Sequence, residues 1–308
     1  MAYTALGAMA WARGRNSLMM LTAGAGALAV AGYRTSHADE NPSGALSPKE
    51  FRSFTITEKT KLTHDTWQYR FGLPADQTAG MDVASCLVTR ALLPNGPGMP
   101  LKAVIRPYTP TSSKEAKGHM DLVVKVYPNG GMSKHIGALK VGDTLEMKGP
   151  FPNLSVTANK WKHVALIAGG SGITPMIQVI DELLGNAEDH THISVMYSNK
   201  TEEDIIMKSR LEKLALRFPG RFKVYFLASD GKFTGGPKTG VVRGAGRITQ
   251  ESIASFIPGF HENVMVMVCG PTGFMETVSG PKAKNDKQGD VGGALAALGY
   301  SKDQVFKF

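Results

Sequence analysis

The chain has 308 residues, which exceeds one typical domain and predicts two domains of about 100 to 150 residues each. Hydrophobic residues make up 42% of it, an ordinary fraction that excludes a largely disordered chain. The net charge of +9 suits nucleic acid, an anionic membrane surface or an acidic protein. Because the basic residues are scattered, without a zinc-finger or RNA-binding signature, we expect no nucleic-acid partner.

The first 47 residues differ from the rest and predict a targeting or anchoring segment with a tether. Residues 18–33 carry no charge, arginines flank them, and no acidic residue precedes Asp39. This run is shorter than the roughly twenty residues that cross a bilayer upright. A cleaved signal peptide is the alternative, but the acid-free, arginine-containing start favours a mitochondrial presequence with a hydrophobic anchor. The endoplasmic reticulum membrane is the second expected location.

Residues 48–157 predict a small antiparallel β-barrel. Short β-rich runs recur between turns at residues 53–57, 66–71, 84–89, 122–127 and 144–147, with no long helix among them.

Residues 161–308 predict a parallel α/β domain. Apolar strands at 193–197, 223–227 and 264–268 alternate with helical stretches such as 203–218. Residues 230–246, rich in glycine and lysine, predict a surface loop. The fold class is therefore α+β, with a barrel followed by a parallel α/β domain and preceded by a hydrophobic segment.

A glycine turn at the start of this second domain predicts a phosphate site. The apolar run 164–168 breaks into Gly169, Gly170 and Gly172 before a helical pattern at 176–180. Glycines let the backbone approach a pyrophosphate, and the free amides at a helix start favour its negative charge. The spacing is neither a dinucleotide fingerprint nor a P-loop. A purely structural β-to-α turn remains the alternative.

Several short motifs, in one order, give the chain a family resemblance. They are RPYTP at 106–110, VVKVY at 123–127, GMS at 131–133, GGSGITP at 169–175, YSNKTEEDI at 197–205, CGPTGFM at 269–275 and VFKF at 305–308. From about Ser47 to its end the chain resembles NADH-cytochrome b5 reductase, within the ferredoxin-reductase-type flavoprotein superfamily. Residues 83–90, 288–290 and 298–300 look most like plant and algal mitochondrial members.

The resemblance implies an FAD site in the barrel domain. The Arg106 guanidinium can bind a pyrophosphate, and the Tyr108 ring can pack against the flavin. Thr109 can bind the flavin edge through its hydroxyl and its backbone amide. By resemblance, the FAD shell also includes Pro107, Val123, Lys125, Gly131, Met132, Ser133 and Thr174. Gly131 stands where the family commonly has a lysine, which removes one possible phosphate contact. The alternative role of Arg106 is purely structural: a salt bridge at the end of a strand.

The resemblance also implies an NADH site in the second domain, made by Gly169, Gly170, Gly172, Pro175, Asp204, Cys269, Gly270, Pro271 and Met275. The matching cysteine in the family lies against the nicotinamide and aligns it with the flavin. The expected catalytic residues are therefore Cys269, beside the nicotinamide, and Thr109, at the flavin edge. Cys269 as a small core residue is the alternative. Asp204 is expected to bind ribose hydroxyls and to repel a 2'-phosphate, which favours NADH; a helix-capping acid is its alternative role.

The expected function is therefore hydride transfer from NADH to FAD, followed by single-electron transfer to cytochrome b5 or a similar haem protein. We expect a membrane-anchored monomer. The alternatives are a membrane-anchored flavin-binding module without turnover and a reductase component of another electron-transfer system. No metal is expected, because His190 and His192 lack a third ligand nearby and two cysteines cannot hold an iron-sulfur cluster.

Overall fold

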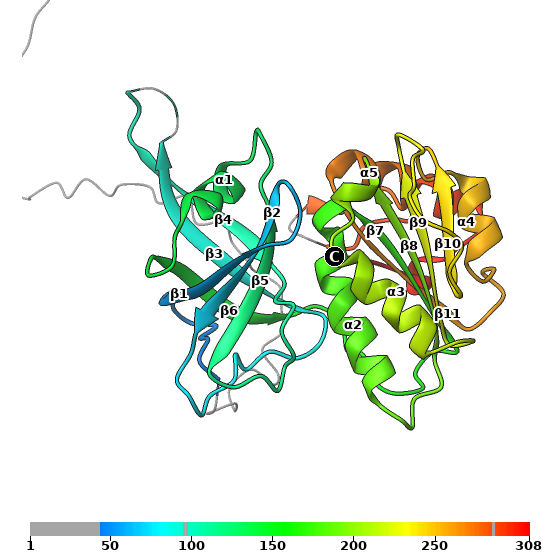
Figure 1. The fold of residues 1–308 in the computed structure, drawn as a ribbon, viewed down its shortest axis with the longest axis horizontal. Helices are drawn as coiled ribbons and strands as arrows, with labels where there is room; N and C mark the ends of the chain where they lie inside the picture. Colours follow the sequence, from blue (N-terminus) through cyan, green and yellow to red (C-terminus); the bar gives the residue numbers. More distant parts are fainter. Residues whose placement is uncertain (1–43, 95, 97, 285–286) are drawn as a thin grey trace, which may run out of the picture. The chain divides into compact units, whose positions relative to one another are not determined.

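A computed structural model describes residues 44–94, 96, 98–284 and 287–308 of the chain (Figure 1). The predicted anchoring segment at 18–33 and most of its tether lie outside these described residues. Among the described residues, no helix is long and apolar enough to cross a membrane.

The first half forms a six-stranded antiparallel sheet, which confirms the predicted antiparallel FAD-binding barrel. Its strands are β1 (Arg52–Lys61), β2 (Thr66–Gly72), β3 (Ser85–Pro94), β4 (Leu101–Tyr108), β5 (His119–Lys125) and β6 (Thr144–Pro152), in the order β4-β3-β6-β1-β2-β5. Strand β4 was not among the predicted strands. It lies at the end of the strand order, where Pro107 can face Val88 without a missing ladder hydrogen bond.

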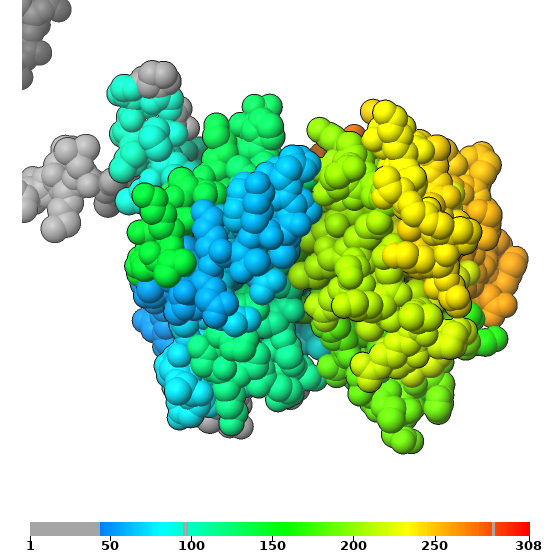
Figure 2. Space-filling view, in the orientation of Figure 1, coloured from blue at the N-terminus to red at the C-terminus, as the bar shows by residue number. Residues whose placement is uncertain are grey.

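Alternation of buried and exposed side chains builds the core of this sheet. In β2, Tyr69 and Phe71 are fully buried while Gln68, Arg70 and Gly72 are partly exposed, as the two-residue period of a strand requires. The helix α1 (Gly131–Ala138) adds Met132 and Ile136 to the same core. In the space-filling view, the β3–β4 hairpin projects beyond the rest of the sheet (Figure 2).

The second half forms a six-stranded parallel sheet, which confirms the predicted α/β domain. Its strands are β7 (His163–Gly169), β8 (His192–Asn199), β9 (Phe222–Ala228), β10 (Val241–Ala245), β11 (Val264–Cys269) and β12 (Val305–Lys307), in the order β10-β9-β8-β7-β11-β12. The helices are α2 (Ile173–Gly185), α3 (Lys208–Arg217), α4 (Gln250–Phe256), α5 (Thr272–Val278) and α6 (Gly293–Ala297). Helices pack on both faces, so the central strands are buried throughout.

Two predictions for this domain were wrong in part. The expected loop at 230–246 contains β10, which pairs in parallel with β9; it is a short edge strand with little apolar signal. The expected helix at 203–218 is instead a 3-10 turn, η2 (Glu202–Asp204), followed by α3. Met207 separates the two with a left-handed backbone at φ 57°, which interrupts the helical hydrogen bonding.

Candidate active site

The glycine turn lies where the strand order of the parallel sheet reverses. Strand β7 is flanked by β8 on one side and by β11 on the other, and Ala168 is the register partner of Cys269. Ligands of open parallel sheets bind at the carboxyl ends of the strands on either side of such a reversal. The register therefore brings together two motifs that are about a hundred residues apart in sequence.

Gly172 and the Cys269–Gly270 segment are in close backbone contact. A Cβ atom added to Gly172 would lie 2.2 Å from the carbonyl oxygen of Cys269 and 2.9 Å from the nitrogen of Gly270. Gly170 adopts φ 54°, a conformation that side chains disfavour. Glycine is thus required at both positions, once for close approach and once for the turn.

The turn ends in a helix start that offers unpaired amides to a phosphate. The short helix η1 (Gly170–Gly172) leads into α2, and no side chain caps α2. Tyr197 Oη donates to the Gly170 carbonyl at 2.8 Å, and Thr174 Oγ1 donates to the Ser171 carbonyl at 3.2 Å. These bonds hold the turn while its first amides remain available for a nucleotide pyrophosphate.

Cys269 ends β11 beside this turn, and its thiol is neutral. The residue is partly exposed, but its sulfur is packed closely enough that burial raises the thiol pKa to about 12. A thiol with this pKa is a poor nucleophile at neutral pH, whereas a neutral side chain can still pack against a ligand ring. Beyond it, the Phe274 ring lies against Gly270, where an added Cβ would approach it to 2.5 Å, and Met275 is buried.

The proposed flavin motif lies on the exposed strand β4. Arg106 and Pro107 are exposed, and Tyr108 and Thr109 are half-buried. The Arg106 guanidinium donates to the carbonyl of its neighbour Ile105 at 2.8 Å, and within the described residues it has no ion pair. Within the described residues, Arg106 therefore has no acidic partner for the alternative salt-bridge role. Burial raises the pKa of the Tyr108 phenol to about 12, so it remains neutral.

The residues from Gly131 to Ser133 form the first turn of α1. Gly130 precedes this eight-residue helix and offers no side-chain cap. Met132 and Ser133 are buried, and Ser133 Oγ accepts a hydrogen bond from the Tyr127 amide at 3.3 Å. The open amides of this turn, together with the unpaired Arg106, fit the negatively charged pyrophosphate of FAD.

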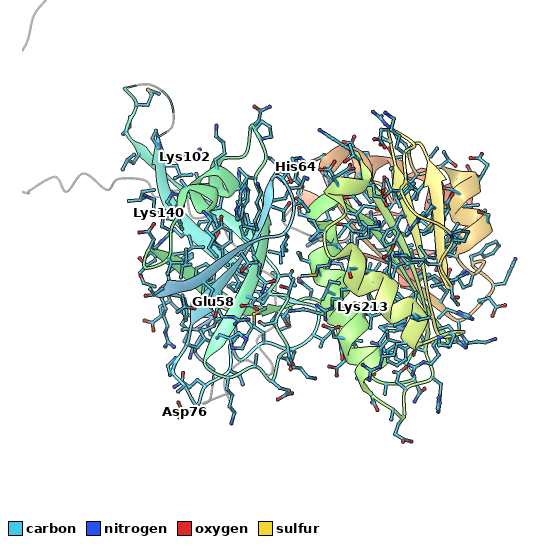
Figure 3. All side chains as sticks on the ribbon, viewed as in Figure 1. Glu58, His64, Asp76, Lys102, Lys140 and Lys213 are labelled. Carbon is cyan, nitrogen blue, oxygen red and sulfur yellow. The ribbon has the colours of Figure 1, made fainter. Side chains whose placement is uncertain are left out.

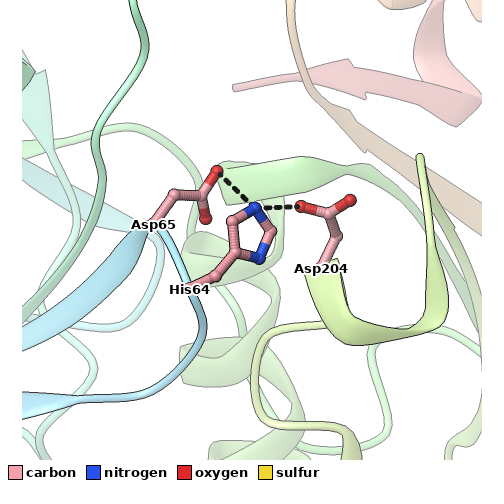
Figure 4. A group of neighbouring side chains, drawn as sticks. All are labelled: His64, Asp65 and Asp204. Atoms are coloured by element: carbon pink, nitrogen blue, oxygen red, sulfur yellow. Dashed lines mark ion pairs between the residues drawn. The ribbon is translucent and has the colours of Figure 1, made fainter.

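Lys125 and Asp204 form an ion pair that joins the two halves of the molecule. Lys125 Nζ lies 2.8 Å from Asp204 Oδ1 and 2.7 Å from Asp65 Oδ2. His64, at the end of the β1–β2 hairpin (Figure 3), places Nε2 3.6 Å from the Asp65 carboxylate and 3.7 Å from that of Asp204 (Figure 4). Thr201 also donates to Asp204 through its amide and hydroxyl, in the capping box of η2.

This cluster changes what Asp204 can do. Burial raises the pKa of Asp204, but the hydrogen bond and charge of Lys125 outweigh burial and hold that pKa below its usual value. Burial likewise opposes the charge on Lys125, whose pKa is nevertheless raised by the two carboxylates. Both groups are therefore charged at neutral pH. Asp204 thus combines the capping role with a negative charge, and Lys125 would offset part of any repulsion between this charge and a 2'-phosphate.

Two nearby cations are also engaged. Lys208 pairs with the buried Glu202, and Arg210 pairs with Asp181 at 2.5 Å. Burial raises the pKa of Glu202, but Lys208 and Thr234 together lower it to about 2. Neither Lys208 nor Arg210 is therefore free of an acidic partner, so neither offers an unpaired charge to a 2'-phosphate.

Sequence reasoning missed four residues that contribute to the site. His64 and Asp65 lie in a turn and gave no signal. Tyr127 Oη lies 3.0 Å from Ser171 Oγ, which links the β5–α1 connection to the glycine turn. Gln178 is the one polar residue in the run 175–180 of α2, and this was a readable signal.

The comparisons with known proteins agree with this geometry. A family model described as an oxidoreductase FAD-binding domain matches residues 53–155, and one described as an oxidoreductase NAD-binding domain matches residues 166–280. The chain is 40% identical to "NADH-cytochrome b5 reductase 2" of Aspergillus fumigatus, covering 96% of this chain and 92% of that protein. It is 41% identical to "NADH-cytochrome b5 reductase-like protein" of Arabidopsis thaliana, covering 88% and 80%.

The fold is similar to a solved reductase structure. The cytochrome b5 reductase domain of Ulva prolifera nitrate reductase superposes with a TM-score of 0.72 at 30% identity, covering 86% of this chain and 99% of that one. Both cofactor domains and the shared architecture identify an oxidoreductase that uses FAD and NADH. The chain therefore belongs to the NADH-cytochrome b5 reductase family.

Proposed function

We propose that this protein transfers electrons from NADH, through bound FAD, to cytochrome b5 or a similar small haem protein. The observation that carries the proposal is the contact between Gly172 and Cys269–Gly270, because it brings together the two distant motifs that we infer bind the nicotinamide. Helix α2, which starts at this site, also contacts Pro110, the last residue of the flavin motif. The family names of the relatives supply the acceptor.

The chemistry comes from the cofactors and the positioning comes from the protein. When bound, FAD supplies a ring that accepts a hydride, two electrons with one proton, and releases the electrons singly. Arg106 and the first turn of α1 would hold its pyrophosphate, and Tyr108 and Thr109 would contact the ring system. The turn at Gly169–Gly172 would hold the nucleotide phosphates, and neutral Cys269 would pack beside the nicotinamide.

We further propose that the protein is a membrane-anchored monomer in mitochondria. The support is the uncharged run at residues 18–33 with its arginine flanks and acid-free start. Expressing the full chain and a variant lacking residues 1–47, each fused to a fluorescent protein, tests location. Carbonate-resistant membrane association of the full chain alone supports an anchor, and equal behaviour of the two contradicts it. Light scattering gives the molar mass of the protein lacking residues 1–47 and so tests whether it is a monomer.

Steady-state kinetics tests the acceptor. Purified protein should reduce ferricyanide with NADH, and should reduce cytochrome b5 at a rate that changes with ionic strength if charged surfaces guide docking. Ferricyanide reduction without cytochrome b5 reduction would contradict the acceptor assignment. Bound flavin that NADH does not reduce would indicate a flavin-binding module without turnover.

A second candidate is a reductase component that serves another enzyme. The Ulva structure supports it, because a reductase domain of this fold works there as part of a nitrate reductase. Co-purification with a molybdenum or haem protein, and preferential electron transfer to that protein over cytochrome b5, would favour this candidate.

A further inference from the structure

Gln178 links helix α2 to the FAD domain through both ends of its side-chain amide. Its Nε2 group donates to the carbonyl oxygen of Pro110 at 3.1 Å, and its Oε1 accepts from the backbone N–H of Ala84 at 3.0 Å. Pro110 directly follows Thr109, and Ala84 directly precedes β3, the strand that pairs with β4. One side chain therefore ties both ends of the flavin-bearing hairpin to the helix that begins at the nicotinamide turn.

The contact is built for an amide. Ala84 is fully buried and adopts φ 60°, a conformation that only a few non-glycine residues take. Pro110 is also buried. Without Gln178, the Pro110 carbonyl and the Ala84 N–H would each lose a hydrogen-bond partner. A carboxamide is the neutral side chain that carries a donor and an acceptor on one planar group, and it satisfies both.

The position of Gln178 connects it to hydride transfer. It lies about one and a half helical turns after Ile173, where the glycine turn ends and α2 begins. A helix is stiff over this length, so a bond at Gln178 also fixes the turn that precedes the helix. Hydride transfer requires the reacting atoms to be about 3 to 3.5 Å apart, and small misplacements are costly.

We propose that Gln178 is a positioning residue for hydride transfer, which sets the spacing between the flavin held beside Thr109 and the nicotinamide held at the glycine turn. This inference rests on the proposed function. Gln178 acts through Pro110, the last residue of the flavin motif, and through Ala84, and it lies outside the glycine turn itself.

A second link on the same helix provides a matched control. Lys114 Nζ lies 2.9 Å from Glu182 Oε1, with both side chains about one third exposed. This ion pair also joins the FAD domain to α2, but it holds the β4–β5 connection and not the flavin segment itself. Partly exposed ion pairs contribute little to stability. Lys114→Met should therefore leave the spacing of the cofactors unchanged.

The test is stopped-flow reduction of the bound flavin by NADH and by NADH deuterated at the transferred hydrogen. Gln178→Met keeps the length of the side chain and removes both hydrogen bonds. Gln178→Glu keeps the acceptor for Ala84 and sets a carboxylate against the Pro110 carbonyl. Both variants should lower the limiting reduction rate by about tenfold to a hundredfold, with little change in the apparent NADH dissociation constant. The deuterium effect should stay at least as large as in the wild type.

The outcomes separate positioning from mere stability. A structural role would lower flavin content or the melting temperature and leave the reduction rate of the remaining holoprotein unchanged, which would overturn the inference. Equal slowing in Lys114→Met would also overturn it, because any loosening of the domains would then suffice. If Gln178→Met does not fold, Gln178→Glu carries the same comparison. Failure of wild-type protein to be reduced by NADH would instead refute the proposed function.

Discussion

Replacing Gly172 by alanine should slow hydride transfer while FAD stays bound. The added Cβ would lie 2.2 Å from the Cys269 carbonyl oxygen and 2.5 Å from its carbonyl carbon. Both are backbone atoms, so no side-chain rotation relieves the clash. The two segments that we propose bind the nicotinamide must separate by roughly 1 Å to restore ordinary contact. Overpacking of this kind costs about 1 to 3 kcal/mol of stability.

The kinetic effect follows from the displacement. A misplacement of about 1 Å at a hydride-transfer contact can slow the reaction by about a hundredfold. We therefore expect the limiting rate of flavin reduction in Gly172→Ala to fall by about tenfold to a hundredfold in stopped-flow experiments. The flavin content should be that of the wild type, because the FAD motifs on β4 and α1 are untouched.

A glycine at the far end of the same helix serves as the control. A Cβ added to Gly185 meets no atom within 4 Å, so Gly185→Ala should be reduced at the wild-type rate and be slightly more stable. A wild-type reduction rate in Gly172→Ala would refute the reasoning that close contact between the two motifs builds the nicotinamide site.

Three further predictions concern charge at the site. Arg106→Ala should weaken FAD binding by about tenfold to a hundredfold, since a charged hydrogen bond contributes about 1.5 to 3 kcal/mol; full flavin content after extended dialysis would argue against the assignment. Asp204→Thr should narrow the preference for NADH over NADPH, and Lys125→Met should widen this preference by exposing the Asp204 charge. Each variant should change the ratio of the kcat/KM values for the two nucleotides by about tenfold. If neither ratio changes, Asp204 has only its capping role. Because burial raises the thiol pKa of Cys269 from 9.0 to about 12, the thiol is uncharged up to well above pH 9, so flavin reduction should show no change near pH 9 and Cys269→Ser should retain measurable turnover. A rate that follows a group titrating near pH 9, and that Cys269→Ser abolishes with FAD still bound, would indicate thiolate chemistry instead.

The sequence determined the two-domain architecture because the two domains differ in their pattern of strands and helices. Alternating short strands between residues 53 and 147 indicate an antiparallel sheet, while apolar strands separated by helices indicate a parallel one. The motifs at 106–110, 169–175 and 269–275 were also readable, because phosphate binding requires glycines and helix starts that leave a local pattern. Strands β4, β10 and β12 were missed: β10 and β12 are only five and three residues long, and β4 is an edge strand with a proline in it.

Only the tertiary structure decided which motifs meet. The pairing of β7 with β11 places Gly172 against Cys269, and no local pattern specifies the order of strands in a sheet. The same holds for Lys125 and Asp204, which form an ion pair across 79 positions of sequence. Local interactions fix the elements, whereas burial of complementary faces fixes their neighbours. The partners of Asp204 and Gln178, and with them the electrostatics and spacing of the site, follow from that packing.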